Sequence, residues 1–200
     1  MQTGLDMDGV VYDWHNPVYD YYKAYKDYDK SYTEFWLDYF PKLSAEEHDF
    51  ILSIDTLYTA MNITDETLNA INLLSKLGTV YYVTARSESL RRITDLWFKR
   101  NNVPFRDNLI MSKDKVSYAK LLKLDYFVDD FASQVIDLSG ITKAYLFAKP
   151  WNIEYQDILP TVRSLTEFYN AVKKDGSAKK TITGTSSILE IADRIELESL

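Results

Sequence analysis

Short apolar segments that alternate with amphipathic helical segments restrict the fold of this chain more than any other feature. Apolar runs rich in β-branched and aromatic residues predict five strands, over 2–6, 79–84, 108–112, 125–129 and 143–148. Apolar residues at helical spacing predict helices over 64–77, 87–101, 115–123, 131–138 and 161–174. This alternation predicts an α/β fold, because parallel strands are joined by helices that cover both faces of the sheet.

The first predicted strand runs directly into two carboxylates and a glycine, Asp6, Asp8 and Gly9. A buried carboxylate is costly unless it is paired or binds a metal, and a hard cation such as Mg²⁺ prefers oxygen ligands. In open α/β folds the ligand site lies at the carboxyl ends of the strands, where Asp6 would be placed. A surface turn is the alternative interpretation, because turns also collect Asp and Gly.

Three later segments place further polar residues at the ends of predicted strands. Thr84 ends the second strand, Lys115 follows the third, and Asp129 with Asp130 ends the fourth. Each has a structural alternative: a helix N-cap, a solvated loop and a helix-capping pair, respectively. Because all of them fall at strand ends in chain order, we predict one site. There the threonine and the lysine would hold an anionic substrate against the carboxylates.

Residues 14–63 interrupt the alternation and are crowded with aromatic side chains. Their spacing predicts short helices over 16–29, 32–40 and 44–54, which we interpret as a small helical cap inserted after the first strand. Most of these aromatic residues are expected to pack the cap, and a minority to stack on a flat substrate group. The predicted core therefore comprises 1–13 and 64–174, and the predicted cap 14–63.

The last predicted unit, 175–200, is a polar linker followed by an amphipathic helix. Apolar residues from Ile188 to Leu197 give that helix one apolar face. Two interpretations remain open: the helix docks on its own core, or it packs on a second copy of the chain and forms a homo-oligomer.

Composition excludes several classes of function. The formal net charge of −7 and the lack of a broad basic surface argue against polymeric nucleic acid as a partner. The absence of cysteine excludes disulfides, thiol catalysis and thiolate metal sites. Neither a secretory signal nor an apolar run long enough to cross a membrane is visible, so we expect a cytoplasmic protein that does not contact membranes.

Four motifs in order resemble those of the haloacid dehalogenase superfamily. Asp6 and Asp8 match its first motif, Thr84 its second, Lys115 its third, and the pair 129–130 its fourth. The resemblance spans roughly residues 2 to 150. It implies a Rossmann-like core, with the insert in the place of a type 1 cap.

The stretch from Leu5 to Trp14 looks like the start of the 5′(3′)-deoxyribonucleotidases and their bacterial and phage relatives. In that family an aromatic residue at the position of Trp14 contacts the nucleoside base, and a basic residue at the position of Lys113 helps to bind substrate. Ala85 and Arg86, which follow the second motif, are further candidates for substrate binding, although the family often has a small hydroxyl residue at position 85. The segment 145–152 also resembles a strand and Pro-aromatic-Asn loop of many relatives.

The resemblance implies phosphoryl transfer through an aspartyl-phosphate. Asp6 is then the nucleophile and Asp8 the general acid and base, while Thr84 and Lys115 grip the phosphoryl oxygens. Mg²⁺ would be held by the Asp6 carboxylate, the Asp8 main-chain carbonyl and the pair Asp129 and Asp130.

The expected function is a Mg²⁺-dependent phosphatase for (deoxy)nucleoside 5′-monophosphates, so the expected partner is a small phosphorylated substrate. A phosphatase for another small monoester, such as a sugar phosphate, is the alternative among enzymes. A non-catalytic nucleotide-binding module is the alternative outside them. No catalytic position is replaced, and a pure binder would not need Asp8. His15 and His48 lack the spacing of a metal site and are expected at the surface or in the cap.

Overall fold

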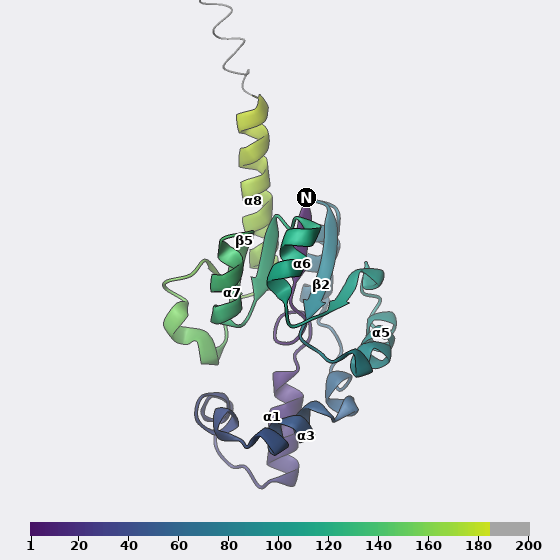
Figure 1. The fold of residues 1–200 in the computed structure, drawn as a ribbon, viewed down its shortest axis with the longest axis vertical. Helices are drawn as coiled ribbons and strands as arrows, with labels where there is room; N and C mark the ends of the chain where they lie inside the picture. The colour runs from purple at the N-terminus through teal and green to yellow at the C-terminus, as the bar shows by residue number, and fades with distance from the viewer. Residues whose placement is uncertain (185–200) are drawn as a thin grey trace, which may run out of the picture.

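A computed structural model describes residues 1–184 and contains one six-stranded sheet (Figure 1). All neighbouring strands are parallel, in the order β3-β2-β1-β4-β5-β6. The strands are β1 (Gln2–Leu5), β2 (Thr79–Thr84), β3 (Leu109–Met111), β4 (Tyr126–Asp129), β5 (Lys143–Phe147) and β6 (Thr161–Val162). The predicted α/β fold is confirmed, and β1 lies between β2 and β4 with polar residues at the ends of all three.

Helices cover both faces of the sheet, as predicted. The helices are α4 (Asp65–Ser75), α5 (Arg91–Arg100) and α8 (Leu165–Gly184) in one apolar cluster, and α6 (Lys115–Leu122) and α7 (Ala132–Ser139) in the other. Successive strand residues alternate between the clusters: Tyr126 and Val128 join the first, and Phe127 joins the second. This period of two is what a strand buried on both faces requires.

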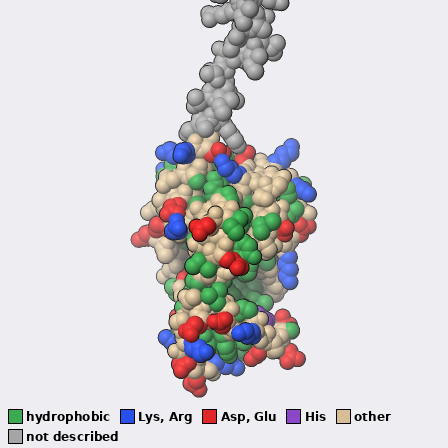
Figure 2. Space-filling model, turned by 90° about the vertical axis from the view of Figure 1, so that its left-hand side faces the viewer, with side chains coloured by type: hydrophobic (Ala, Val, Ile, Leu, Met, Phe, Trp, Pro, Cys, Tyr) green, Lys and Arg blue, Asp and Glu red, His purple; other side chains and the backbone are tan. Residues whose placement is uncertain are grey.

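The insert forms a separate helical lobe below the carboxyl edge of the sheet (Figure 1). Its elements are α1 (His15–Tyr25), α2 (Tyr32–Glu34), a π-helix (Phe35–Tyr39), a 3₁₀ turn (Phe40–Lys42), α3 (Ala45–Leu52) and a second 3₁₀ turn (Asp55–Tyr58). Capping boxes at Ser31 and Ser44 start α2 and α3. Hydrophobic side chains gather where this lobe meets the core (Figure 2).

Three sequence predictions about these elements need correction. The single helix predicted over 32–40 is divided among α2, the π-helix and the 3₁₀ turn. The helix predicted over 161–174 begins only at Leu165, because Thr161 and Val162 pair with β5 as an edge strand after Pro160. A proline suits the approach to an edge strand, since it offers no N–H to a neighbour.

The predicted linker is wrong for residues 175–184, because α8 continues to Gly184. Asp175, at the start of the segment predicted as a linker, accepts a hydrogen bond from the Tyr126 hydroxyl (2.6 Å) and forms an ion pair with Lys143 (2.8 Å). These contacts tie this turn of α8 to the sheet. The predicted amphipathic helix from Ile188 lies outside the described residues. Within the described part of the chain, no helix combines the length and the apolar character needed to cross a bilayer.

Candidate active site

The predicted polar residues meet at the carboxyl edge of the three central strands. Asp6 follows β1, Thr84 ends β2, and Asp129 ends β4, while Lys115 begins α6 after β3. All four side chains are buried. The parallel order produces this meeting, because the carboxyl ends of neighbouring parallel strands lie at the same edge.

Lys115 bridges two of the carboxylates. Its Nζ donates to Oδ1 of Asp6 at 2.6 Å and to Oδ2 of Asp129 at 2.7 Å. Burial alone would lower the pKa of Lys115, but the charges of Asp6 and Asp129 raise it above its usual range. Burial raises the pKa of Asp6 to about 7, although Lys115 acts in the opposite direction. The lysine therefore stays charged, and it compensates only part of the negative charge around it.

Asp130 completes a cluster that fits a cation. One oxygen from each of Asp6, Asp129 and Asp130 lies within 4.8 Å of the others. Neither carboxylate oxygen of Asp130 meets a hydrogen-bond donor among the described residues, although the side chain is fully buried. Burial, together with the charges of the other two aspartates, raises its pKa well above the usual range. Buried carboxylate oxygens without donors are suitable ligands for Mg²⁺, which prefers oxygen. The fourth predicted ligand, the Asp8 carbonyl, stays a prediction.

A tight turn after β1 presses against this cluster. The Met7 carbonyl accepts hydrogen bonds from the N–H groups of Val10, Val11 and Tyr12. Gly9 has a φ of +90°, and a Cβ at this position would lie 2.3 Å from Oδ2 of Asp130. Only glycine readily adopts this φ and leaves room for the Asp130 carboxylate, so steric constraints explain the glycine that follows the two aspartates.

Asp8 forms a two-pronged ion pair with Arg86. The Nε of Arg86 lies 2.8 Å from Oδ2 of Asp8, and Nη2 lies 2.5 Å from Oδ1. The arginine side chain is 1% exposed and the aspartate side chain 24%. The main-chain N–H of Arg86 also donates to the Thr84 hydroxyl at 3.2 Å. The segment after β2 therefore supports the carboxylate that follows β1.

A cavity of about 410 Å³ lies between the core and the insert. Three of the predicted substrate-binding residues, Ala85, Arg86 and Lys113, line it. The remaining lining residues are Leu52, Tyr58, Ser87, Leu90, Met111 and Ser112. Because Leu52 and Tyr58 belong to the insert, both the core and the cap line the cavity. The carboxylates and Lys115 do not line it, and Arg86, which is paired with Asp8, connects the cavity to them.

Trp14, the fourth predicted substrate-binding residue, is not among the residues that line this cavity. Its side chain is 7% exposed and packs in the aromatic cluster of the cap. The ring centroids of Trp36, Phe40 and Tyr58 lie 6.0 to 6.2 Å from its own. In this arrangement Trp14 fills the cap core.

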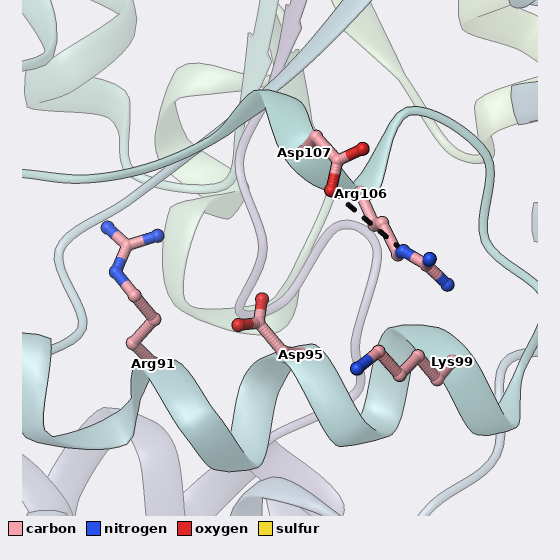
Figure 3. A pocket seen from close by; sticks show the side chains of 5 residues that line it. All are labelled: Arg91, Asp95, Lys99, Arg106 and Asp107. Atoms are coloured by element: carbon pink, nitrogen blue, oxygen red, sulfur yellow. Dashed lines mark ion pairs between the residues drawn. The ribbon is translucent and has the colours of Figure 1, made fainter.

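A second cavity, of about 300 Å³, lies at the surface beside α5 (Figure 3). Its lining side chains are all charged: Arg91, Asp95, Lys99, Arg106 and Asp107. None of the predicted site residues lines it. We therefore assign the candidate site to the first cavity and the adjoining carboxylates.

No protein-family sequence model matches the chain, and no curated protein matches it in sequence. Solved structures do match it. A haloacid dehalogenase family hydrolase from Deinococcus radiodurans R1, solved with bound phosphate and sodium, superposes with a TM-score of 0.63. It is 12% identical, and the match covers 88% of this chain and 96% of that one. This chain has the haloacid dehalogenase-like fold.

Two further structures share the fold. A haloacid dehalogenase-like protein of unknown function from Agrobacterium tumefaciens C58 has a TM-score of 0.62 at 14% identity, covering 88% of this chain and 98% of that one. An L-2-haloacid dehalogenase from Xanthobacter autotrophicus has a TM-score of 0.54 at 8% identity, covering 86% and 98%. These likenesses extend over nearly the whole length of each relative.

Two residues of this haloacid dehalogenase-like fold contact the site although the sequence did not assign them to it. Asn152 donates from Nδ2 to the Asp130 carbonyl (2.8 Å) and to the Phe147 carbonyl (2.9 Å). The segment 145–152 resembles a loop of many relatives, but it is far from Asp130 in the sequence, so the sequence did not indicate the contact between Asn152 and Asp130.

His15 lies in the cap, as expected, but it is buried against the cluster instead of facing solvent. Its Nε2 is 3.9 Å from Oδ2 of Asp130, and its ring stacks against Trp151 at 4.1 Å between centroids. Burial, with Lys149 nearby, lowers the pKa of His15 well below its usual value, so the imidazole is neutral. No spacing in the sequence indicated this contact, which depends on where α1 meets the sheet.

Proposed function

We propose that this chain is a Mg²⁺-dependent phosphatase that hydrolyses (deoxy)nucleoside 5′-monophosphates through an aspartyl-phosphate on Asp6. The observation that carries the proposal is the buried cluster of Asp6, Asp129 and Asp130, in which Lys115 balances only part of the charge. A second carboxylate, Asp8, stands two residues from the proposed nucleophile and is partly exposed. These are the groups that a two-step transfer of a phosphoryl group requires.

In the first step, a carboxylate oxygen of Asp6 attacks phosphorus and the bond to the leaving oxygen breaks. Asp8 acts here in its protonated form, in which one of its oxygens is no longer paired with Arg86, and it gives that proton to the leaving oxygen, so the alcohol leaves neutral. Lys115 and Thr84 hold the phosphoryl oxygens in line with the attacking carboxylate. In the second step, Asp8 takes a proton from water, the resulting hydroxide attacks phosphorus, and inorganic phosphate leaves Asp6 free.

Asp6, Asp129 and Asp130 would hold the cation, with the Asp8 carbonyl as a further ligand. Bound Mg²⁺ supplies positive charge that reduces the repulsion between the carboxylate of Asp6 and the phosphoryl oxygens. The hydrolase from D. radiodurans was solved with bound phosphate and sodium, which supports the binding of an anion and a cation by a protein of this fold.

The same fold also occurs in L-2-haloacid dehalogenases. Displacement of a halide needs no proton on the leaving group, whereas an alkyl phosphate does. Asp8 as a second carboxylate, and the donor-free oxygens of Asp130, therefore favour a phosphate ester over a haloacid.

The cavity of about 410 Å³ supports a substrate with a sizeable leaving group. Tyr58, whose ring packs on Arg86, gives part of the wall an aromatic character, and the exposed Lys113 offers a positive charge there. A nucleoside fits this mixture of apolar and polar lining.

One observation favours a second candidate, a sugar phosphate or another small monoester. Trp14, the residue matched to base contact, is packed within the cap core. If the ring stays there, the leaving group meets Tyr58 alone among the aromatic residues that line the cavity.

Phosphate release from a panel of nucleoside monophosphates, deoxynucleoside monophosphates and sugar phosphates tests both candidates. We expect release with Mg²⁺, none with EDTA, and none from Asp6→Asn. The exposed Asp107→Asn is the matched control and should retain wild-type rates. Activity confined to sugar phosphates would favour the second candidate, and activity on a haloacid alone would overturn both.

A further inference from the structure

The contacts of Arg86 differ from those of a free substrate ligand. The guanidinium is almost fully buried, and two of its nitrogens are paired with the two carboxylate oxygens of Asp8. Such a bidentate pair fixes the direction in which the carboxyl group of Asp8 lies. Within the described residues, Asp8 is the only carboxylate within 4.0 Å of this arginine.

The rest of the guanidinium is fixed by three other side chains. Nη1 donates to the hydroxyl of Thr94 on α5 at 3.0 Å. The guanidinium carbon, Cζ, lies 4.8 Å from the ring centroid of Tyr58 and 5.2 Å from that of Tyr12, within the range of cation–π contacts. The arginine is therefore oriented by α5, by the turn after β1 and by the last turn of the cap.

We propose that Arg86 is the positioning residue of Asp8, and that it acts through this carboxylate instead of binding the substrate itself. The proposal rests on the proposed function, in which Asp8 gives a proton to the leaving oxygen. Arg86 also lines the cavity assigned to the leaving group, so its partner is held beside that group. Because Tyr58 belongs to the cap, the direction of Asp8 depends on how the cap is seated.

Substrates with different leaving groups separate this role from others. A nucleoside monophosphate releases an alcohol and needs the proton, whereas p-nitrophenyl phosphate releases a stable anion without one. Arg86→Lys keeps the charge but loses the two-pronged geometry. We expect kcat/KM for the nucleotide, which reports the steps up to release of the alcohol, to fall at least about tenfold. The kcat/KM for p-nitrophenyl phosphate should stay within about twofold, because neither phosphate binding nor release of this leaving group uses Arg86 or a proton from Asp8.

Two other results would overturn the proposal. A rise in KM for both substrates with kcat retained would make Arg86 a substrate ligand. Losses of kcat/KM that are equal on both substrates, without such a rise in KM, would make its role merely structural. Arg92→Lys, at an exposed arginine of α5, is the matched control and should change kcat/KM for neither substrate.

A second variant covers the case in which Arg86→Lys does not fold. Thr94→Val removes the acceptor of Nη1 but keeps the shape of the side chain, and Thr94→Ser keeps the hydroxyl. We expect Thr94→Val to lower kcat/KM for the nucleotide severalfold and to leave kcat/KM for p-nitrophenyl phosphate unchanged, and Thr94→Ser to keep the wild-type values. Equal effects of the two variants would contradict the proposal.

Urea unfolding tests the pair without relying on activity. Asp8→Asn should lower the midpoint strongly in the wild type, because it leaves a buried arginine unpaired, and much less in an Arg86→Met background. Additive shifts would overturn the pairing. If the wild type releases phosphate from no substrate, the proposed function is overturned and the positioning role with it. Non-additive midpoint shifts in this double-mutant cycle would still show that Asp8 and Arg86 are paired.

Discussion

Asn152 donates a hydrogen bond to the main-chain carbonyl of Asp130, 22 residues earlier in the chain, at 2.8 Å. The same amide holds the Phe147 carbonyl, and its oxygen accepts from the N–H of Lys149. One buried side chain therefore ties the loop after β5 to the carboxylate cluster at the end of β4.

Asn152→Ala removes this tie and leaves the two carbonyls without their donors. We expect a loss of about 1–3 kcal/mol in the free energy of unfolding and a fall of about tenfold in cation affinity, as for other residues that support metal ligands. Urea unfolding and calorimetric titration with Mg²⁺ measure the two effects. Asn72→Ala, at an exposed position of α4, should change neither. Unchanged cation affinity would separate Asn152 from the site.

Lys115→Met should destabilise the cation-free protein by about 3–5 kcal/mol, because it leaves buried carboxylates without their counter-ion. Mg²⁺ should restore part of this loss by supplying positive charge to the same oxygens. Urea unfolding with Mg²⁺ and with EDTA gives both numbers. Lys113→Met, at an exposed lysine two residues away, should shift stability by no more than about 0.5 kcal/mol. Equal effects of the two variants would contradict the ion-pair assignment.

The pKa of Asp6 gives the stability a defined dependence on pH. Burial raises this pKa from 3.8 to about 7, so between these values the folded state binds more protons than the unfolded state. The contribution of Asp6 is therefore fully present below pH 3.8 and is lost as pH rises through about 7. Without cation, the unfolding free energy of the wild type should fall relative to that of Asp6→Asn, by at most about 1.4 kcal/mol per pH unit. Parallel pH profiles of the two proteins in EDTA would contradict the raised pKa.

Gly9→Ala should disturb both the backbone and the cluster. The residue has a φ of +90°, and the new Cβ would meet Oδ2 of Asp130. We expect a loss of about 1–3 kcal/mol and weaker binding of Mg²⁺. Gly140→Ala is the control: its φ is −77° and no atom lies within 4 Å of an added Cβ, so stability should stay the same or rise slightly. Thermal unfolding with and without Mg²⁺ compares the two.

The strand pattern predicted most of the core. Five apolar runs gave strands whose ends lie within one residue of the observed ones, since short β-rich segments between helical segments have few other arrangements. β6 was missed because two residues carry no periodicity, and only the neighbouring β5 makes Thr161 and Val162 a strand. The cluster of Asp6, Lys115, Asp129 and Asp130 follows from the same pattern, because the three aspartates stand at strand ends and Lys115 begins the helix that follows β3.

Contacts that depend on the exact seating of the cap could not be predicted. Arg86 and Asp8 are 78 residues apart, and either could have faced the substrate. His15 lies against Asp130 because α1 starts beside the carboxyl edge of the sheet. Trp14 lies inside the cap because the π-helix brings Trp36 beside it. In each case side-chain packing decides the outcome, and packing has no signature in the order of residues.

The insertion of the cap at the edge that carries the carboxylates has an evolutionary consequence. The reacting groups lie on strand ends whose positions the sheet enforces, whereas Leu52 and Tyr58 reach the cavity from a lobe that the sheet does not constrain. Under the proposed function, mutations in 15–57 can therefore alter which molecules are accepted while the reaction itself is inherited unchanged. The contact between Tyr58 and Arg86 is the exception, because a substitution of Tyr58 also alters the arginine that we propose positions Asp8.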